Sequence, residues 1–195
     1  KYGVGMVFFP RDKKVANACR DVLKKNIIAL GFELIGFRGV PVDHSVPGPD
    51  ASEVEPVIEQ VFVKSKGDSI PDEALERKLF VLRNYTSHKI SRDVKGSNTE
   101  FYITSFSSKT IVYKGQLRTE QLRKYFFDLQ DPRLRTALAL VHSRFSTNTF
   151  PNWKLAQPFR YIAHNGEINT IRGNVNKMKS KEALFRSSHF TDAEL

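Results

Sequence analysis

The first forty residues alternate between strand and helix patterns, and this restricts the possible folds more than any other feature. Residues 2–9 are apolar, rich in β-branched and aromatic types, and end at Pro10, which predicts a buried strand. Asp12 can cap a helix whose apolar residues recur at helical spacing as far as Gly31. Residues 32–40 return to a strand pattern. The chain therefore begins with a strand, a helix and a second strand.

The remainder of the chain continues this mixture without a repeat or a linker long enough to separate two domains. The further strands expected are residues 57–64, 101–106, 110–113 (in a hairpin with 101–106), 136–142 and 159–165. The further helices expected are residues 51–58, 72–91 (capped by Asp72), 119–125 and a helix from Asn169 onward. Strands separated by short turns or single helices predict an α+β layered domain with a mainly antiparallel sheet.

Composition limits the classes of protein that remain. The 195 residues carry a formal charge of +10, but the basic residues mostly alternate with acids, so nucleic-acid binding is not favoured. The single cysteine, Cys19, excludes a disulfide framework and indicates a reducing compartment; we expect it to be a small core residue. No apolar run reaches the ~18 residues of a membrane helix. Because the chain begins at Lys1 in an apolar segment, we interpret it as an internal fragment.

Residues 141–178 contain the unusual features, including the only tryptophan. Two expected strands each run into a polar cluster there, which predicts that the clusters share one site. Arg144, in the first cluster, has the planar donors that bind a carboxylate or phosphate in a bidentate manner. Considered alone, an arginine here is more often a surface or ion-paired residue.

The second cluster contains the tripeptide His164-Asn165-Gly166. The side-chain amide of Asn165 and a backbone N–H at Gly166 could form an oxyanion hole, although Asn-Gly is also a common hairpin turn. Neither His142 nor His164 has the spacing of a metal-binding motif, so a buried structural histidine is expected in each place and no metal site is predicted.

The order of these motifs resembles a known family. The segments HSRFST, NTFPNW-x-LAQPFRY and AHNGEINT-x-RGN are similar to the glutaminase domain of the glutamate synthase large (alpha) subunit, a class II glutamine amidotransferase. The upstream segments YGVGMVFFP, EPVIEQVFV, LERKLFVLR and SSKTIVYKG extend the likeness over most of the chain. The resemblance implies a four-layer αββα sandwich of the N-terminal nucleophile hydrolase type, of which residues 1–195 are an internal, incomplete part.

The resemblance also implies roles for individual residues. Arg144 matches the arginine that holds the α-carboxylate of glutamine, with Thr147 and Asn148 beside it in the substrate pocket. Asn165 and Gly166 match the pair that stabilises the oxyanion formed when a thiolate attacks the glutamine amide.

Three departures from the family pattern accompany these matches. The nucleophile of the family is an N-terminal cysteine, which this chain lacks, and Cys19 is not its equivalent. The acid that binds the substrate ammonium is expected beyond Leu195, and Lys177 stands where relatives usually carry tryptophan. The isolated chain is therefore expected to lack glutaminase activity.

The whole enzyme implied by the resemblance makes glutamate from 2-oxoglutarate and ammonia released from L-glutamine, in the cytoplasm. It would use FMN and an iron-sulfur cluster, none bound by these residues, with the remaining synthase domains and a small NAD(P)H-oxidising beta subunit as partners. Two alternatives are an amidotransferase domain of a different synthase and a noncatalytic, basic nucleic-acid-binding module.

Overall fold

The computed structural model describes residues 1–67, 70–97, 100–145, 150–159, 162 and 170–191. It forms two compact units, residues 1–163 and residues 164–195, which we describe separately. The elements in chain order are β1 (Gly3–Phe9), α1 (Lys13–Ala29), β2 (Phe32–Gly39), α2 (Pro49–Glu53), β3 (Val57–Ser65), α3 (Asp72–Asp93), β4 (Tyr102–Ser107), α4 (Thr119–Tyr125), η1 (Phe127–Gln130) and α5 (Ile171–Glu182).

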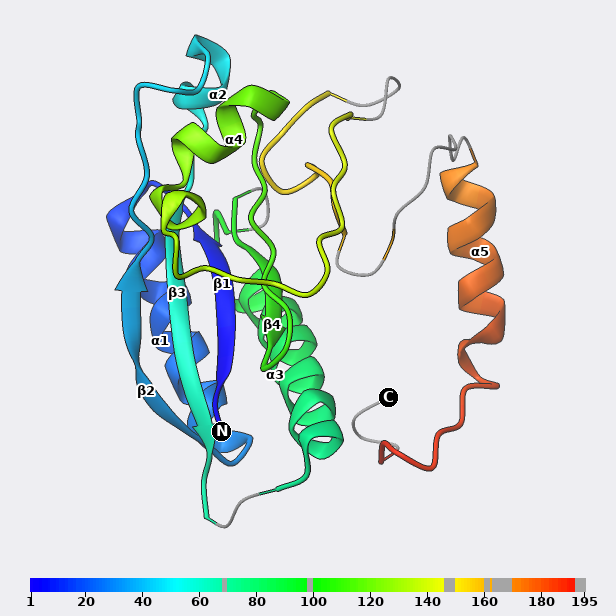
Figure 1. Cartoon of the computed structure of the whole chain (residues 1–195). Helices are drawn as coiled ribbons and strands as arrows, with labels where there is room; N and C mark the ends of the chain where they lie inside the picture. The colour runs from blue at the N-terminus through cyan, green and yellow to red at the C-terminus, as the bar shows by residue number, and fades with distance from the viewer. Residues whose placement is uncertain (68–69, 98–99, 146–149, 160–161, 163–169, 192–195) are drawn as a thin grey trace. The chain divides into compact units, whose positions relative to one another are not determined.

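The first unit is built on a four-stranded antiparallel sheet with the order β2-β3-β1-β4 (Figure 1). The strands predicted at residues 2–9, 32–40, 57–64 and 101–106 are confirmed, as is the α+β class. The first strand, helix and second strand are also as expected, but β3 lies between β1 and β2. Strand β1 is almost fully buried, which explains its continuous apolar sequence in place of an alternating one. The second sheet of the predicted sandwich stays a prediction.

Helices α1 and α3 cover one face of the sheet (Figure 1). Their apolar stripes join Val7 and Phe9 of β1 in the main core, and each fully buried leucine in it contributes about 1.5–3 kcal/mol. Inside this core Asn26 of α1 donates to the Thr86 hydroxyl of α3 at 3.2 Å, so both polar groups are satisfied. Cys19 is part of the same cluster, as predicted.

The caps of these helices differ. Asp12 caps α1 as expected, because its side chain accepts from the backbone N–H groups of Lys14 and Val15. The cap predicted at Asp72 is wrong: Pro71 precedes α3, and Asp72 is the first helical residue and pairs with Lys1. An acid in the first turn still complements the helix dipole.

The opposite face of the sheet carries a second, smaller core. Met6 and Phe8 of β1 point to this side, because successive side chains of a strand alternate between faces. They pack with Tyr125 and Phe126 at the end of α4 and with Trp153 from the later part of the chain. This smaller core holds the segments that lead to the predicted site.

The strand predicted at residues 110–113 is wrong. These residues run beside β4, but side chains of β4 take the place of a backbone ladder. Thr104 donates its hydroxyl to the carbonyl of Val112, and the N–H of Val112 donates to the Ser105 hydroxyl at 3.1 Å. Serine and threonine hydroxyls compete with ladder hydrogen bonds in this way.

The strand predicted at residues 136–142 is also wrong. The segment has no regular structure, and Leu138 and Val141 are 76% and 74% exposed. An apolar run becomes a strand when it finds a ladder partner and a face to bury, and neither is present among the described residues. Of the strand predicted at residues 159–165, Phe159 and Ile162 pair as an isolated bridge, and the rest lies outside the described residues.

The predicted helices are confirmed, most of them with shifted bounds, but of residues 51–58 only 51–53 are helical. Helix α2 ends three residues before Pro56, α4 spans the predicted residues 119–125, and α5 begins two residues after Asn169. None of the helices in the described ranges is both long and apolar enough to span a bilayer.

Candidate functional site

The predicted site residues divide into one that the structure describes and four that it does not. Arg144 is exposed, and its backbone N–H donates to Nδ1 of His142 at 3.2 Å. The predicted pocket residues Thr147 and Asn148 and the predicted oxyanion pair, Asn165 and Gly166, lie outside the described residues. The structure therefore describes the segments that lead to the two polar clusters, rather than the clusters themselves.

These two approach segments line one cavity. One wall is residues 140–143, which precede Arg144, and another is Gln157 and Pro158, which precede the second cluster. The third wall consists of Tyr113, Lys114, Gly115, Leu117, Arg118, Thr119 and Leu122. The sequence predicted that the two clusters share a site, and their approach segments do meet, although neither is a strand.

The lining of this cavity is mostly apolar, with a few polar side chains among them. His142 is half-buried in its wall, close to the peptide of Arg144. The carboxamide oxygen of Gln157 is buried and has no hydrogen-bond partner among the described residues. The cavity wall thus carries a histidine and a buried amide oxygen within a largely apolar lining.

Trp153 anchors the second approach segment to the sheet. Its ring is buried between Phe8 and Tyr125, with centroid distances of 6.2 and 5.4 Å, and its indole N–H donates to the Ala51 carbonyl at 2.9 Å. Gly115 lies against the ring so closely that a Cβ there would be 2.4 Å from the Cζ3 atom. Glycine at this position lets the tryptophan seat fully.

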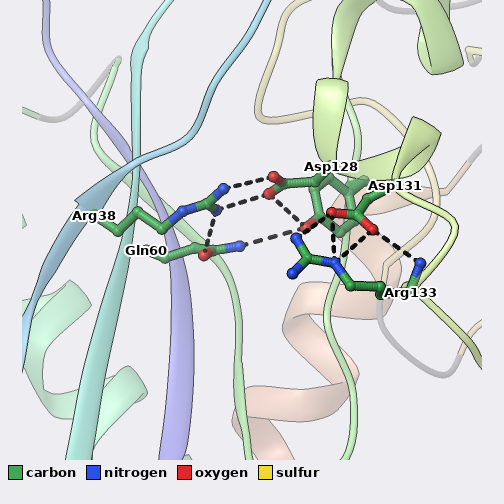
Figure 2. Close-up of polar contacts among 6 residues, drawn as sticks. Arg38, Gln60, Asp128, Asp131 and Arg133 are labelled. Atoms are coloured by element: carbon green, nitrogen blue, oxygen red, sulfur yellow. Dashed lines mark hydrogen bonds and ion pairs between the residues drawn. The ribbon is translucent and has the colours of Figure 1, made fainter.

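A charged network beside the cavity joins the sheet to η1 (Figure 2). The Arg38 guanidinium of β2 donates to both carboxylate oxygens of Asp128, at 2.6 and 2.8 Å, and to the Gln60 side chain of β3 at 2.9 Å. Tyr113, which neighbours the cavity, donates its hydroxyl to Asp128 at 3.0 Å. The hydrogen bond from Arg38, and to a smaller extent that from Tyr113, holds the pKa of Asp128 below its ordinary value. Burial raises the pKa of Tyr113.

A second ion pair lies close to this network. Asp131 accepts from the side chain and the backbone of Arg133, and these bonds lower the pKa of Asp131 to about 2 (Figure 2). This ion pair lies at the surface, with Arg133 exposed and Asp131 half-buried, and contributes little to stability. The half-buried network at Asp128 is the part that fixes the position of Tyr113, which lines the cavity.

Cys19 is unsuited to nucleophilic chemistry. Burial raises the pKa of its thiol to about 11, and the nearby Arg20 guanidinium offsets this only in part. A nucleophilic cysteine needs the opposite setting, an accessible thiol with a lowered pKa. Within the described ranges, no three His, Cys, Asp or Glu side chains come together as a metal site.

Comparison with known proteins gives the family. The model of the family "Glutamine amidotransferases class-II" matches residues 1–195. The chain is 45% identical over 186 residues to the chloroplastic ferredoxin-dependent glutamate synthase of Spinacia oleracea, covering 95% of this chain and 11% of that protein. It is 45% identical to the glutamate synthase [NADPH] large chain of Azospirillum brasilense and 44% identical to that of Bacillus subtilis (strain 168), in each case over 97% of this chain and 12% of the relative. The chain belongs to the class II glutamine amidotransferases.

Proposed function

We propose that these residues form the substrate-binding and charge-stabilising part of the glutaminase domain of a glutamate synthase. Family membership over residues 1–195 carries the proposal, because the motifs around Arg144 and Asn165 resemble those of this family in residue type and in order. The similarity to glutamate synthases over at least 95% of the chain favours this enzyme over another amidotransferase. Residues 1–195 would be an internal part of one glutamine amidotransferase domain.

In the proposed reaction, Arg144 binds the α-carboxylate of L-glutamine with two parallel hydrogen bonds, and Thr147 and Asn148 complete the polar pocket. A cysteine thiolate supplied from outside these residues attacks the side-chain amide carbon, forming a C–S bond and moving an electron pair onto the carbonyl oxygen. The Asn165 amide and the Gly166 N–H donate to that oxyanion.

The intermediate then collapses. The electron pair returns to re-form the carbonyl, the C–N bond breaks, and the nitrogen leaves as ammonia after taking a proton. Water hydrolyses the remaining thioester through a second oxyanion, which releases glutamate and regenerates the thiol. The same donor pair serves both oxyanions, so its loss should slow both steps.

The whole enzyme would add this ammonia to 2-oxoglutarate in a reductive reaction with FMN and an iron-sulfur cluster. Such a cluster takes about four cysteine ligands, and this chain contains one buried cysteine, so its ligands would lie elsewhere in the polypeptide. The remaining synthase domains, a small NAD(P)H-oxidising beta subunit and a cytoplasmic location complete the proposal.

The proposal can be tested with the full polypeptide encoded by the gene, supplied with glutamine. Ammonia release that depends on Asn165, together with 2-oxoglutarate-dependent glutamate formation, is the expected result. Ammonia release without any reaction of 2-oxoglutarate would instead support a different synthase. Salt-dependent binding to nucleic acid without ammonia release would support the basic binding module.

A further inference from the structure

Lys114 is buried in a manner that a lysine seldom is. Its side chain is 2% exposed, in a chain whose other basic residues lie mostly at the surface. Burying an ammonium group is unfavourable unless polar or π-electron partners replace the lost water. A lysine in this position therefore needs specific partners, and these partners identify the segments that Lys114 joins.

The partners come from one strand and from both ends of a later segment. The Lys114 ammonium donates to the backbone carbonyl of Lys154 at 2.9 Å. It also lies 4.5 Å from the ring centre of Tyr102 in β4 and 4.4 Å from the ring centre of Phe159. Cation–π contacts at such distances are strongest when the cation is shielded from water, as here. One ammonium group thus binds both ends of residues 154–159 to the sheet.

The segment held in this way leads directly to the predicted oxyanion pair. At the end of this segment the N–H of Ile162 donates to the Phe159 carbonyl at 3.0 Å. Asn165 follows three residues later in the chain. Lys114 and Gly115 also line the cavity reached by residues 140–143, which precede Arg144. The Lys114–Gly115 dipeptide is therefore the place where the approaches to both predicted clusters meet.

We propose that Lys114 is a positioning residue for the glutaminase reaction, which holds residues 154–159 so that the oxyanion-binding residues that follow in the chain are correctly placed. It acts through this segment and does not contact the substrate. The inference rests on the proposed function. Since a displacement of about 1 Å can cost about 10²-fold in rate, a residue that sets the course of this segment should affect catalysis strongly.

The test is a comparison of glutamine hydrolysis by the full polypeptide and its K114M, K114R and K109M variants. Methionine keeps the apolar stem but removes the cation and the donor, whereas arginine keeps both. Lys109 is an exposed lysine on the loop after β4 and serves as the matched control. K114M should lower kcat by about 10- to 100-fold with KM within about threefold of the wild-type value, because the segment positions oxyanion donors. K114R should recover part of kcat, and K109M should leave both constants unchanged.

A K114M enzyme that is less heat-stable but keeps wild-type kcat and KM below its unfolding temperature would overturn the proposal. If K114M does not accumulate as folded protein, F159L takes its place. This substitution removes one of the two rings around the Lys114 ammonium but leaves the hydrogen bond to Lys154. An unchanged kcat in F159L would equally overturn the proposal. A wild-type polypeptide that releases no ammonia contradicts the proposed function itself, whereas full activity in these variants contradicts only the role of Lys114.

Discussion

Replacing Gly115 with alanine should destabilise the first unit by about 1–3 kcal/mol, because the added methyl group overlaps the Trp153 ring. The new Cβ would lie 2.4 Å from Cζ3, 2.8 Å from Cε3 and 3.2 Å from a methyl group of Leu117. The ring cannot move aside freely, since Phe8 and Tyr125 pack on it and its N–H is bonded to Ala51.

The upper limit of this effect follows from the same contacts. If the overlap expels Trp153 from its site, the chain loses the burial of a large aromatic side chain, which costs about 3–5 kcal/mol. Expulsion also leaves the Ala51 carbonyl without its indole donor, which costs about 1 kcal/mol more. A loss above about 3 kcal/mol would therefore indicate expulsion of the ring and not local strain.

Urea denaturation of the 195-residue chain, followed by far-UV circular dichroism, measures the free energy of unfolding in every variant, including those that lack Trp153, the only tryptophan. The control is G39A at the exposed end of β2, where an added Cβ meets nothing within 4 Å; it should change the free energy of unfolding by less than about 0.5 kcal/mol. In the double variant G115A/W153F the smaller ring should relieve the overlap, so the two effects should be less than additive. Equal stabilities of G115A and G39A, or strict additivity in the double variant, would refute the packing argument.

Three further outcomes follow from the structure. D128N should lower the free energy of unfolding at pH 7 by about 1–2 kcal/mol, a modest value because Arg38 is partly exposed. Folding lowers the pKa of Asp128, so the difference in stability from wild type should be complete above the unfolded pKa of about 4 and should vanish as the pH falls through the folded pKa. The control D21N, at an exposed aspartate, should change stability little. Cys19, with a buried thiol of pKa about 11, should resist a thiol reagent at pH 8 until the chain is unfolded in urea, and rapid labelling of the native chain would contradict its place in the core. The isolated chain should release no ammonia from glutamine above background, and release that N165A abolishes would contradict the need for an external nucleophile.

The strands and helices of the first unit could be predicted because burial left a clear pattern in the sequence. Residues 3–9 are covered on both faces, so their apolar run is continuous and its interpretation as a strand is secure. The bounds of α1 followed from the cap at Asp12 and from Gly31, which adopts a positive φ of 78° after the helix. Local signals sufficed where local interactions decide the structure.

The errors arise where a distant partner decides the structure. Residues 110–113 have strand composition, but the hydroxyls of Thr104 and Ser105 bind their backbone, and no local pattern reveals that competition. Residues 136–142 are apolar but lack a ladder partner among the described residues. The order of β1 and β2, separated by β3, was likewise set by pairing between distant segments.

The candidate site was predictable only in part. Arg144 and Asn165 were each ambiguous on their own chemistry, and the order of the surrounding motifs gave them roles. Lys114 was missed, because a lysine before Gly115 has the appearance of a turn, and two of its three partners, Lys154 and Phe159, lie 40 or more residues later in the chain. A polar residue inside the apolar, aromatic run IVYKG was the available signal, since such a residue is seldom buried without a specific partner.

The central claim is that these residues bind glutamine and stabilise the charge that develops on its amide. The most direct measurement is the kcat and KM of glutamine hydrolysis by the full polypeptide carrying N165A or R144M. N165A should lower kcat by about 10²- to 10³-fold with KM little changed, whereas R144M should act chiefly by raising KM. An N165A enzyme with kcat within about threefold of wild type would contradict the claim, because an oxyanion donor cannot be removed at so small a cost.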